Sequence, residues 1–277
     1  MLLDPLLRPI GRTLRADARA AAEAAGLYAV DAPTAPVTDQ DLAALPEPAR
    51  RWLRWAGVVG RPQDVRFEAR LRGRFRRGPG QPWMPMDAWQ DNALHPIGRV
   101  FLMRLDVAHV VPMVGRDTYL NGRGRMVGTL FGLVTVADGA GEPFDIGELT
   151  TWLNDAVVLA PSMLLDDRVA WSPVDDGSFT VAVTDHGRTV SAIVFVDDEG
   201  AVTDFTTTDR FADLADGPVR AEWRTPIDGW TERAGRRLPT RCQAVWHLPD
   251  GTTLPYVDGT FDPDSVTRNP PALSDGG

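Results

Sequence analysis

The stretch VAWSPVDDGSFTVAVTDHGRTVSAIVFV, residues 169–196, decides the fold of this chain. Apolar and polar residues alternate in it, and the runs are separated by Asp176-Gly177 and His186-Gly187. Period-two alternation broken by Gly-containing turns is typical of antiparallel strands that bury one face and are joined by hairpins. We therefore predict strands over 169–174, 179–184 and 189–196.

The same pattern of alternating residues and Gly-containing turns continues on both sides of this stretch. Downstream we predict strands over 201–209, 219–225, 230–233, 241–248 and 254–261. Upstream, strict alternation over 65–75 sets apolar residues against arginines and one glutamate, and further strands are predicted over 84–92, 99–107, 118–120 and 123–130. Asn121-Gly122 is a strong hairpin signal between the last two. Roughly a dozen strands exceed a comfortable flat sheet, so we expect the sheet to curl.

One apolar helix interrupts the strands. Asp145-Ile146-Gly147-Glu148 resembles a capping box, and the helix it opens carries an apolar stripe before Pro161. We predict an α+β fold: a curved antiparallel sheet, resembling a half-barrel, wrapped around a central helix over 145–165. The predicted organisation is an N-terminal helical segment over 1–60, the sheet over 61–262 and a disordered tail over 263–277.

Composition limits the function. The net charge of −9 and the pI near 4.9 argue against nucleic-acid binding, which needs a basic face. The chain has no lysine for a Schiff base and one cysteine, Cys242, so it forms no internal disulfide. We expect no secretory signal and a cytoplasmic location.

A leucine-and-arginine helix over 2–26 would pack on the domain, on a second subunit or on a membrane surface. The sequence leaves the oligomeric state open.

Several motifs carry a family resemblance: Trp-Leu-Asn-Asp at 152–155, Trp-Ser-Pro-Val-Asp-Asp at 171–176, Trp-Arg-Thr-Pro at 223–226 and Val-Trp-His-Leu-Pro-Asp-Gly at 245–251. With Leu-Pro-Glu-Pro at 45–48 and Tyr-Leu-Asn-Gly at 119–122, they span about residues 40 to 260. In these motifs the chain resembles a large, mostly uncharacterised bacterial family that is common in actinobacteria. Members are similar in outline to half-barrel lipoprotein carriers, whose curved sheet holds an acyl chain. The resemblance implies that shape and supplies no catalytic residues.

Candidate site residues are few. The histidines His95, His109, His186 and His247 show no metal-ligand spacing, so we expect no metal, and no phosphate loop or nucleophile elbow predicts a cofactor. His247, at a strand end, and Asp155, near the buried side of the helix, are the candidates for proton transfer. Asp155 has a structural alternative, pairing with an arginine such as Arg210.

A curved sheet with many tryptophans favours an apolar cavity. We expect Trp152, Trp223, Trp246 and Tyr256 to line it, with Arg123, Asp155 and His247 as polar anchors. The predicted function is binding of a hydrophobic small molecule or lipid. The alternatives are a cofactor-independent isomerase or cyclase in the same cavity, and a protein–protein interaction module that uses Trp52 and Trp55 or the arginine-rich strand.

Overall fold

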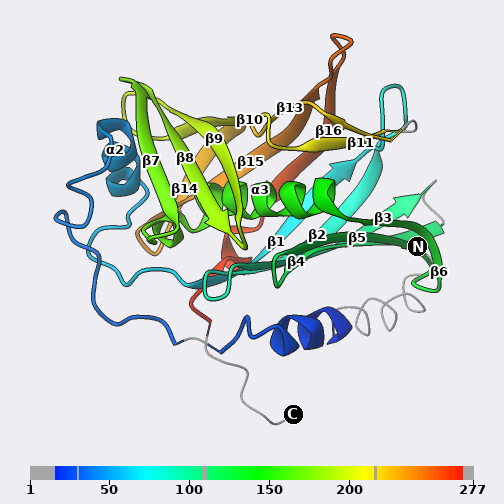
Figure 1. The fold of residues 1–277 in the computed structure, drawn as a ribbon, viewed down its shortest axis with the longest axis horizontal. Coiled ribbons are helices and arrows are strands. Elements are labelled where there is room, and N and C mark those ends of the chain that lie inside the picture. Colours follow the sequence, from blue (N-terminus) through cyan, green and yellow to red (C-terminus); the bar gives the residue numbers. More distant parts are fainter. Residues whose placement is uncertain (1–15, 30, 108–110, 215–216, 271–277) are drawn as a thin grey trace.

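A large antiparallel sheet bends around one long helix, as the computed structural model shows for residues 16–29, 31–107, 111–214 and 217–270 (Figure 1). In this described part, fifteen strands form the main sheet, whose order is β6-β5-β4-β3-β2-β1-β16-β15-β13-β10-β9-β8-β7, with β14 on β15 and β17 on β1. The predicted fold class is confirmed.

The first half of the strands forms a meander: β1 (Arg66–Phe75), β2 (Met84–Ala93), β3 (Gly98–Val107), β4 (Val111–Leu120), β5 (Arg123–Leu130) and β6 (Val134–Ala140). The second half is β7 (Val169–Asp175), β8 (Ser178–Asp185), β9 (Arg188–Val196), β10 (Val202–Thr207), β13 (Glu222–Arg224), β14 (Ile227–Arg233), β15 (Arg236–His247) and β16 (Thr253–Phe261). A separate hairpin joins β11 (Phe211–Leu214) to β12 (Gly217–Arg220).

Helix α3 (Glu142–Leu159) links the two halves of the sheet. It leaves edge strand β6 and leads through a short 3₁₀ helix, Pro161–Leu164, to the opposite edge strand β7. Strand β16 then returns beside β1, so the halves are continuous through their first and last long strands. Figure 1 shows α3 lying between the two halves, on the concave side of the sheet. Nearly every face of α3 is buried, as expected for a helix enclosed by a curled sheet.

The start of α3 differs from the predicted capping box. The helix begins three residues earlier than residue 145, after Gly141, and Asp145 is buried. The Asp145 carboxylate accepts hydrogen bonds from the backbone N–H of Gly124 (2.7 Å) and from Arg188 Nη2 (2.6 Å). Asp145 therefore fastens the first turn of α3 to strands β5 and β9, a role that a local sequence motif does not reveal.

Gly124 sets how closely α3 approaches β5. A Cβ atom at this position would lie 2.1 Å from the carbonyl oxygen of Phe144 and 2.7 Å from the backbone nitrogen of Asp145. Both contacts are with backbone, so the helix would have to move. We expect Gly124→Ala to lower the free energy of unfolding by about 1–3 kcal/mol, the usual cost of overpacking. Urea unfolding measures this effect. Gly78→Ala is the control for a glycine with room around it and no positive φ, since the nearest atom to its added Cβ would be Gln81 Cγ at 3.9 Å; equal losses in both variants would contradict the packing argument.

Two strands of the first half escape the sequence pattern. Strand β4 begins at Val111, seven residues before the predicted start. The prediction missed these residues because Pro112 and Gly115 are of types that are depleted in strands. Strand β6 was not predicted, since its exposed residues and its Gly139 give no alternation. Both strands widen the sheet over α3.

The arginine-rich face of β1 is paired within the chain. Arg66 is only 5% exposed and forms a bidentate ion pair with Asp91 of β2 (3.0 and 2.8 Å), and Arg70 pairs with Asp87 in the same way. The outward face predicted to be solvated is thus partly covered, because carboxylates of the neighbouring strand satisfy its guanidinium groups.

The N-terminal helical segment packs on the domain. Residues 16–24 are helical, and Ala18 and Ala22 are buried against Val100 of β3 on the outer face of the sheet; residues 1–15 lie outside the described part. Helix α2 (Glu47–Trp55) confirms the second predicted helix. Its Trp52 is 1% exposed and stacks on Phe179, so Trp52 does not form an exposed contact face.

The chain after β16 is ordered where a tail was expected. Pro263–Ser265 forms a short 3₁₀ helix and strand β17 (Thr267–Arg268) pairs with β1. The Asn269 side chain then accepts from the backbone N–H of Val65 (2.8 Å). Residues 271–277 lie outside the described part. Hydrogen bonds to backbone groups next to β1 account for this order, and composition alone does not indicate them.

Candidate functional site

A cavity of about 280 Å³ lies between α3 and the concave face of the sheet. This volume is close to the lower end of the range for small-molecule sites. Its walls come from β1–β6 on one side and from β11, β12, β13, β15 and β16 on the other, with α3 along one flank.

Strand register explains the polarity of the cavity. Directly opposed residues of antiparallel strands point to the same face. One inward row is Ala69, Gln90, Phe101, Asp117 and Met126; the next is Leu71, Ala88, Met103, Gly115 and Gly128; the one after it contains Met86, Leu105 and Met113. The first row carries the polar groups, and the next two are apolar. The cavity therefore has a polar end and an apolar end.

Two glycines provide room in the apolar part. A Cβ atom at Gly115 would lie 3.1 Å from Met103 Cε, and one at Gly128 would lie 2.9 Å from Met113 Cε. Glycine in the interior of a strand weakens the strand and marks places where another group approaches the backbone. At these two positions the missing side chains leave space that flexible methionines border.

A buried triad forms the floor of the polar end. Arg99 of β3 donates from Nε to Asp155 (2.8 Å) and from Nη1 to Glu148 (2.8 Å), both on α3. Asn92 donates to the same Asp155 oxygen (3.1 Å). Glu148 and Asp155 are seven residues apart and thus lie on one helix face. Asp155 is held structurally, by Arg99 and not by Arg210.

Two carboxyl groups of this end resist ionisation. Burial raises the pKa of Glu148 to about 7; the Arg99 guanidinium opposes this shift, and the nearby Asp117 carboxyl adds to it. Burial likewise raises the pKa of Asp117, against the attraction of Arg99 and Arg210. These carboxyl groups share the influence of the same two arginines, so the site holds a proton near neutral pH.

Glu148 makes stability depend on pH in a defined direction. Its pKa in the folded state lies above the unfolded value, so between about pH 4.5 and 7 the folded chain binds more protons, and stability falls as pH rises through this window. We expect wild type to lose on the order of 2 kcal/mol between pH 5 and 8 through this group. In Glu148→Gln the loss should shrink. Urea unfolding at both pH values measures it, with Glu142→Gln at the exposed start of α3 as control; an unchanged pH dependence in Glu148→Gln would contradict the assignment.

Arg210 forms the roof of the polar end. Its guanidinium lies 4.1 Å from the ring centre of Trp223 and 5.4 Å from that of Trp246, and it donates to the Tyr256 hydroxyl (2.8 Å). Trp223 Nε1 donates to the same hydroxyl (3.1 Å). Within the described residues, Arg210 forms no ion pair. An arginine stacked on aromatic rings keeps its charge and presents its remaining N–H groups to the cavity.

Buried polar atoms without partners gather on the same walls. Among the described residues, no hydrogen-bond partner is found for Gln90 Nε2, Asn154 Nδ2, Asp117 Oδ1 and Thr225 Oγ1. Gln90, Asn154 and Thr225 are each at most 7% exposed. Buried polar atoms are nearly always bonded, and each exception requires an explanation. A ligand with a polar end would supply the missing partners.

The structure brings together four of the residues predicted from sequence. Asp155, Trp223, Trp246 and Tyr256 all line the cavity. Trp152 instead lies in the core and donates to the backbone carbonyl of Ala93 (2.9 Å).

Two predicted anchors lie elsewhere. Arg123 is exposed on the β4–β5 hairpin and pairs with Asp145. His247 lies at the end of β15 with Nδ1 3.2 Å from the Thr253 hydroxyl. Neither is among the residues that line the cavity.

Sequence reasoning missed Arg99, Asp117 and Glu148. A signal existed for Arg99, because it lies on the inward-facing side of β3, where the other residues are apolar. Glu148, Thr151 and Asp155 also form a polar stripe on a helix predicted to be buried. Asp117 had no such signal, since the strand around it begins with Pro112 and was predicted only from residue 118.

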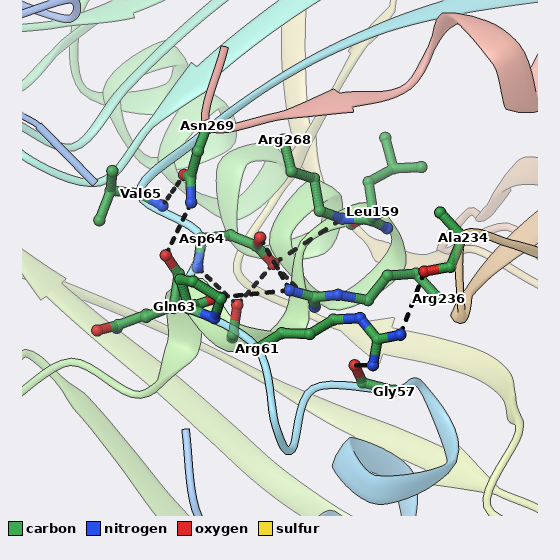
Figure 2. A network of polar contacts seen from close by, with 12 residues as sticks. Gly57, Arg61, Gln63, Asp64, Val65, Leu159, Ala234, Arg236, Arg268 and Asn269 are labelled. Carbon is green, nitrogen blue, oxygen red and sulfur yellow. Dashed lines mark hydrogen bonds and ion pairs between the residues drawn. The ribbon is translucent and has the colours of Figure 1, made fainter. Parts of the chain in front are cut away.

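A second buried ion cluster fastens the C-terminal end of α3 (Figure 2). Asp64, 1% exposed, accepts from Arg236 Nη1 and Nη2 (3.1 Å each) and from the Ser162 hydroxyl (2.6 Å). Arg268 lies 3.8 Å from Asp64 and donates to the carbonyl oxygen of Leu159 (2.9 Å) at the end of the helix. Burial lowers the pKa of Arg268 to about 10. The Arg236 and Arg268 guanidinium groups both donate to partners within the chain, so we interpret this cluster as structural.

Within the described ranges, no helix is long and apolar enough to cross a membrane. In the same ranges, no group of three or more His, Cys, Asp or Glu side chains is placed to hold a metal ion.

The fold and the site define a protein with a curved antiparallel sheet and an internal cavity that is polar at one end. The chain belongs to a family of unknown function (DUF6544), whose model matches residues 35–259. This match confirms the predicted membership of an uncharacterised family. No curated protein matches the chain.

Two solved structures are similar in outline. One is a LolA superfamily protein from Nitrosomonas europaea, with 11% identity and a TM-score of 0.36 over 77% of this chain and 91% of the other. The second is a DUF1329 family protein from Desulfovibrio piger, with 9% identity and a TM-score of 0.42 over 88% of this chain and 96% of the other.

Proposed function

We propose that this protein binds a small, largely apolar molecule in the cavity between α3 and the sheet. The observation that carries the proposal is the cavity itself, whose lining combines Leu, Met, Phe, Val and Trp side chains with charged and polar groups such as Arg99, Asp117 and Arg210. A hollow of this size with convergent polar groups is the usual form of a small-molecule site, whereas a protein core is normally filled.

The volume restricts the ligand. A space near the lower end of the range for small-molecule sites suits a molecule of roughly ten non-hydrogen atoms, such as a medium-length chain. A lipid would enter with one chain and leave the rest outside. Contact with a membrane surface stays a prediction, since most of the leucine-and-arginine stretch lies in residues 1–15, outside the described part.

The single cysteine provides a direct test. Cys242 lines the cavity, is 7% exposed, and its burial raises the pKa of the thiol to about 12. We expect methyl methanethiosulfonate, which is small and uncharged, to label Cys242 at least tenfold faster than the anionic sulfonatoethyl reagent. Labelling through global unfolding would admit both reagents alike. 1-Octanol should then slow the uncharged reagent at least tenfold.

Native mass spectrometry of the purified chain complements the labelling. We expect an apolar molecule of low mass to be retained in the gas phase and released on unfolding. Equal labelling by both reagents and no effect of 1-octanol would overturn the proposed function.

A further inference from the structure

Among the described residues, the polar end of the cavity contains one cation without an ion pair and one carboxyl group with an unpartnered oxygen. Arg210 forms no ion pair within the described residues, and Asp117 Oδ1 has no hydrogen-bond partner there. The two groups influence each other electrostatically yet form no ion pair with one another. A ligand group placed between them would need an acceptor oxygen for Arg210 and a shared proton or donor for Asp117.

A carboxyl group meets both needs. One of its oxygens accepts from a guanidinium, and the other shares a proton with a neighbouring carboxyl group, since two adjacent carboxylates do not both ionise. Gln90 Nε2 and Asn154 Nδ2, buried and unpartnered on the same walls, add donors for these oxygens. A hydroxyl group can also accept from Arg210 and donate to Asp117, but it brings no negative charge to pair with the guanidinium, and an ammonium group would face Arg210 unfavourably.

We propose that the cavity is selective for apolar monocarboxylic acids, held with the carboxyl group between Arg210 and Asp117, and that each molecule binds together with one proton. This inference rests on the proposed function of the cavity and goes beyond it by naming the ligand class and the proton. No covalent step is involved; the proton comes from solvent and leaves when the acid leaves.

The other charged groups around Asp117 are consistent with proton uptake. Arg99 of β3 pairs with Asp155 and Glu148 of α3, whereas Arg210 forms no ion pair within the described residues. Met126 of β5 and Gln90 of β2 are uncharged. Arg76 and Arg77, which follow β1, are further cations of the lining, and on the far wall the titratable groups are Asp213, Tyr256 and Cys242. Burial already disfavours the ionised forms of Asp117 and Glu148. An acid that entered as an anion without a proton would add a further negative charge beside these two carboxyl groups.

The experiment compares octanoate, 1-octanol and octanamide by titration calorimetry from pH 6 to pH 9. For octanoate we expect Kd to rise between pH 6 and pH 9, by up to about tenfold per pH unit, because one proton is taken up. The Kd of 1-octanol should change less than threefold over the range, and octanamide should bind without pH dependence.

Two variants assign the effect to its residues. In Asp117→Asn the amide donates to the carboxylate without a proton, so octanoate at pH 9 should bind at least tenfold more tightly and with less than half the slope. In Arg210→Met octanoate should bind at least tenfold more weakly while 1-octanol changes less than threefold. Asp213→Asn, exposed at the rim of the cavity on β11, is the charge-matched control. Retained 1-octanol affinity shows that each variant is folded.

The outcomes separate the two proposals. Octanoate that binds no better than 1-octanol at pH 6, or with the same slope in Asp117→Asn as in wild type, overturns the carboxylic-acid inference and leaves the apolar cavity standing. Failure of all three compounds to bind overturns both.

Discussion

Replacement of Asp64 by asparagine is expected to lower the free energy of unfolding by about 3–5 kcal/mol, the cost of leaving a buried charge without its partner. Asp64 is 1% exposed and is the only carboxylate among the described residues within 4.0 Å of Arg236 and Arg268. Both guanidinium groups are largely buried, so solvent does not replace the lost interaction.

The Asp64 cluster joins segments that are far apart in sequence. Arg236, at the start of β15, and Arg268, in β17, both lie beside Asp64 (Figure 2), and Ser162 follows α3. Its loss should therefore weaken contacts between both halves of the sheet and the end of α3. Urea unfolding followed by far-UV circular dichroism measures the change.

Asp39→Asn is the matched control for Asp64→Asn. Asp39 pairs with Arg54 at 2.7 Å, but the two side chains are 65% and 50% exposed. Exposed pairs typically contribute ~0–1 kcal/mol, so the control should remain near wild type. Equal losses in both variants would show that burial does not set the energy of the Asp64 cluster.

Replacement of Gly115 by leucine is expected to weaken the binding of 1-octanol about 100-fold. The new side chain would project into the apolar part of the cavity and occupy room for about four of roughly ten ligand atoms. At about 0.8 kcal/mol per buried methylene, the lost contacts amount to about 3 kcal/mol, which corresponds to that factor.

Gly115→Leu should leave the fold intact. The nearest atom to an added Cβ is Met103 Cε at 3.1 Å, the end of a flexible side chain, and the backbone at Gly115 is compatible with a side chain. Leucine also suits a strand better than glycine. Ala170→Leu, on the exposed face of β7, is the control for an added apolar side chain. Titration with 1-octanol distinguishes the two, and unchanged binding in Gly115→Leu would place the ligand elsewhere.

The architecture followed from sequence because its determinants are local. Alternation over 169–196 and 65–75 and the turns at Asn121-Gly122 and Asp250-Gly251 set strand after strand, and the apolar helix before Pro161 filled the concave side. Strand β6 and most of β4 were missed because Gly139, Pro112 and Gly115 hide the pattern. Pairing across the sheet supplies the hydrogen bonds that these residues do not predict locally.

The candidate site was less accessible to sequence reasoning. The aromatic wall of Trp223, Trp246 and Tyr256 was anticipated from residue type, but the polar end depends on register. Arg99 meets Glu148 and Asp155 only because β3 crosses beneath α3, and Arg210 meets Trp223 only because the chain turns back after β10. Contacts between residues that are far apart in the chain cannot be predicted from a single sequence.

A crystal structure grown with 8-bromo-octan-1-ol would locate the bound ligand. We expect one strong anomalous bromine peak inside the cavity, near Met103 and Leu105, with the hydroxyl oxygen toward Asp117 and Arg210. A cavity closed over its own side chains, or bromine found only on the outer surface of the sheet, would contradict this expectation.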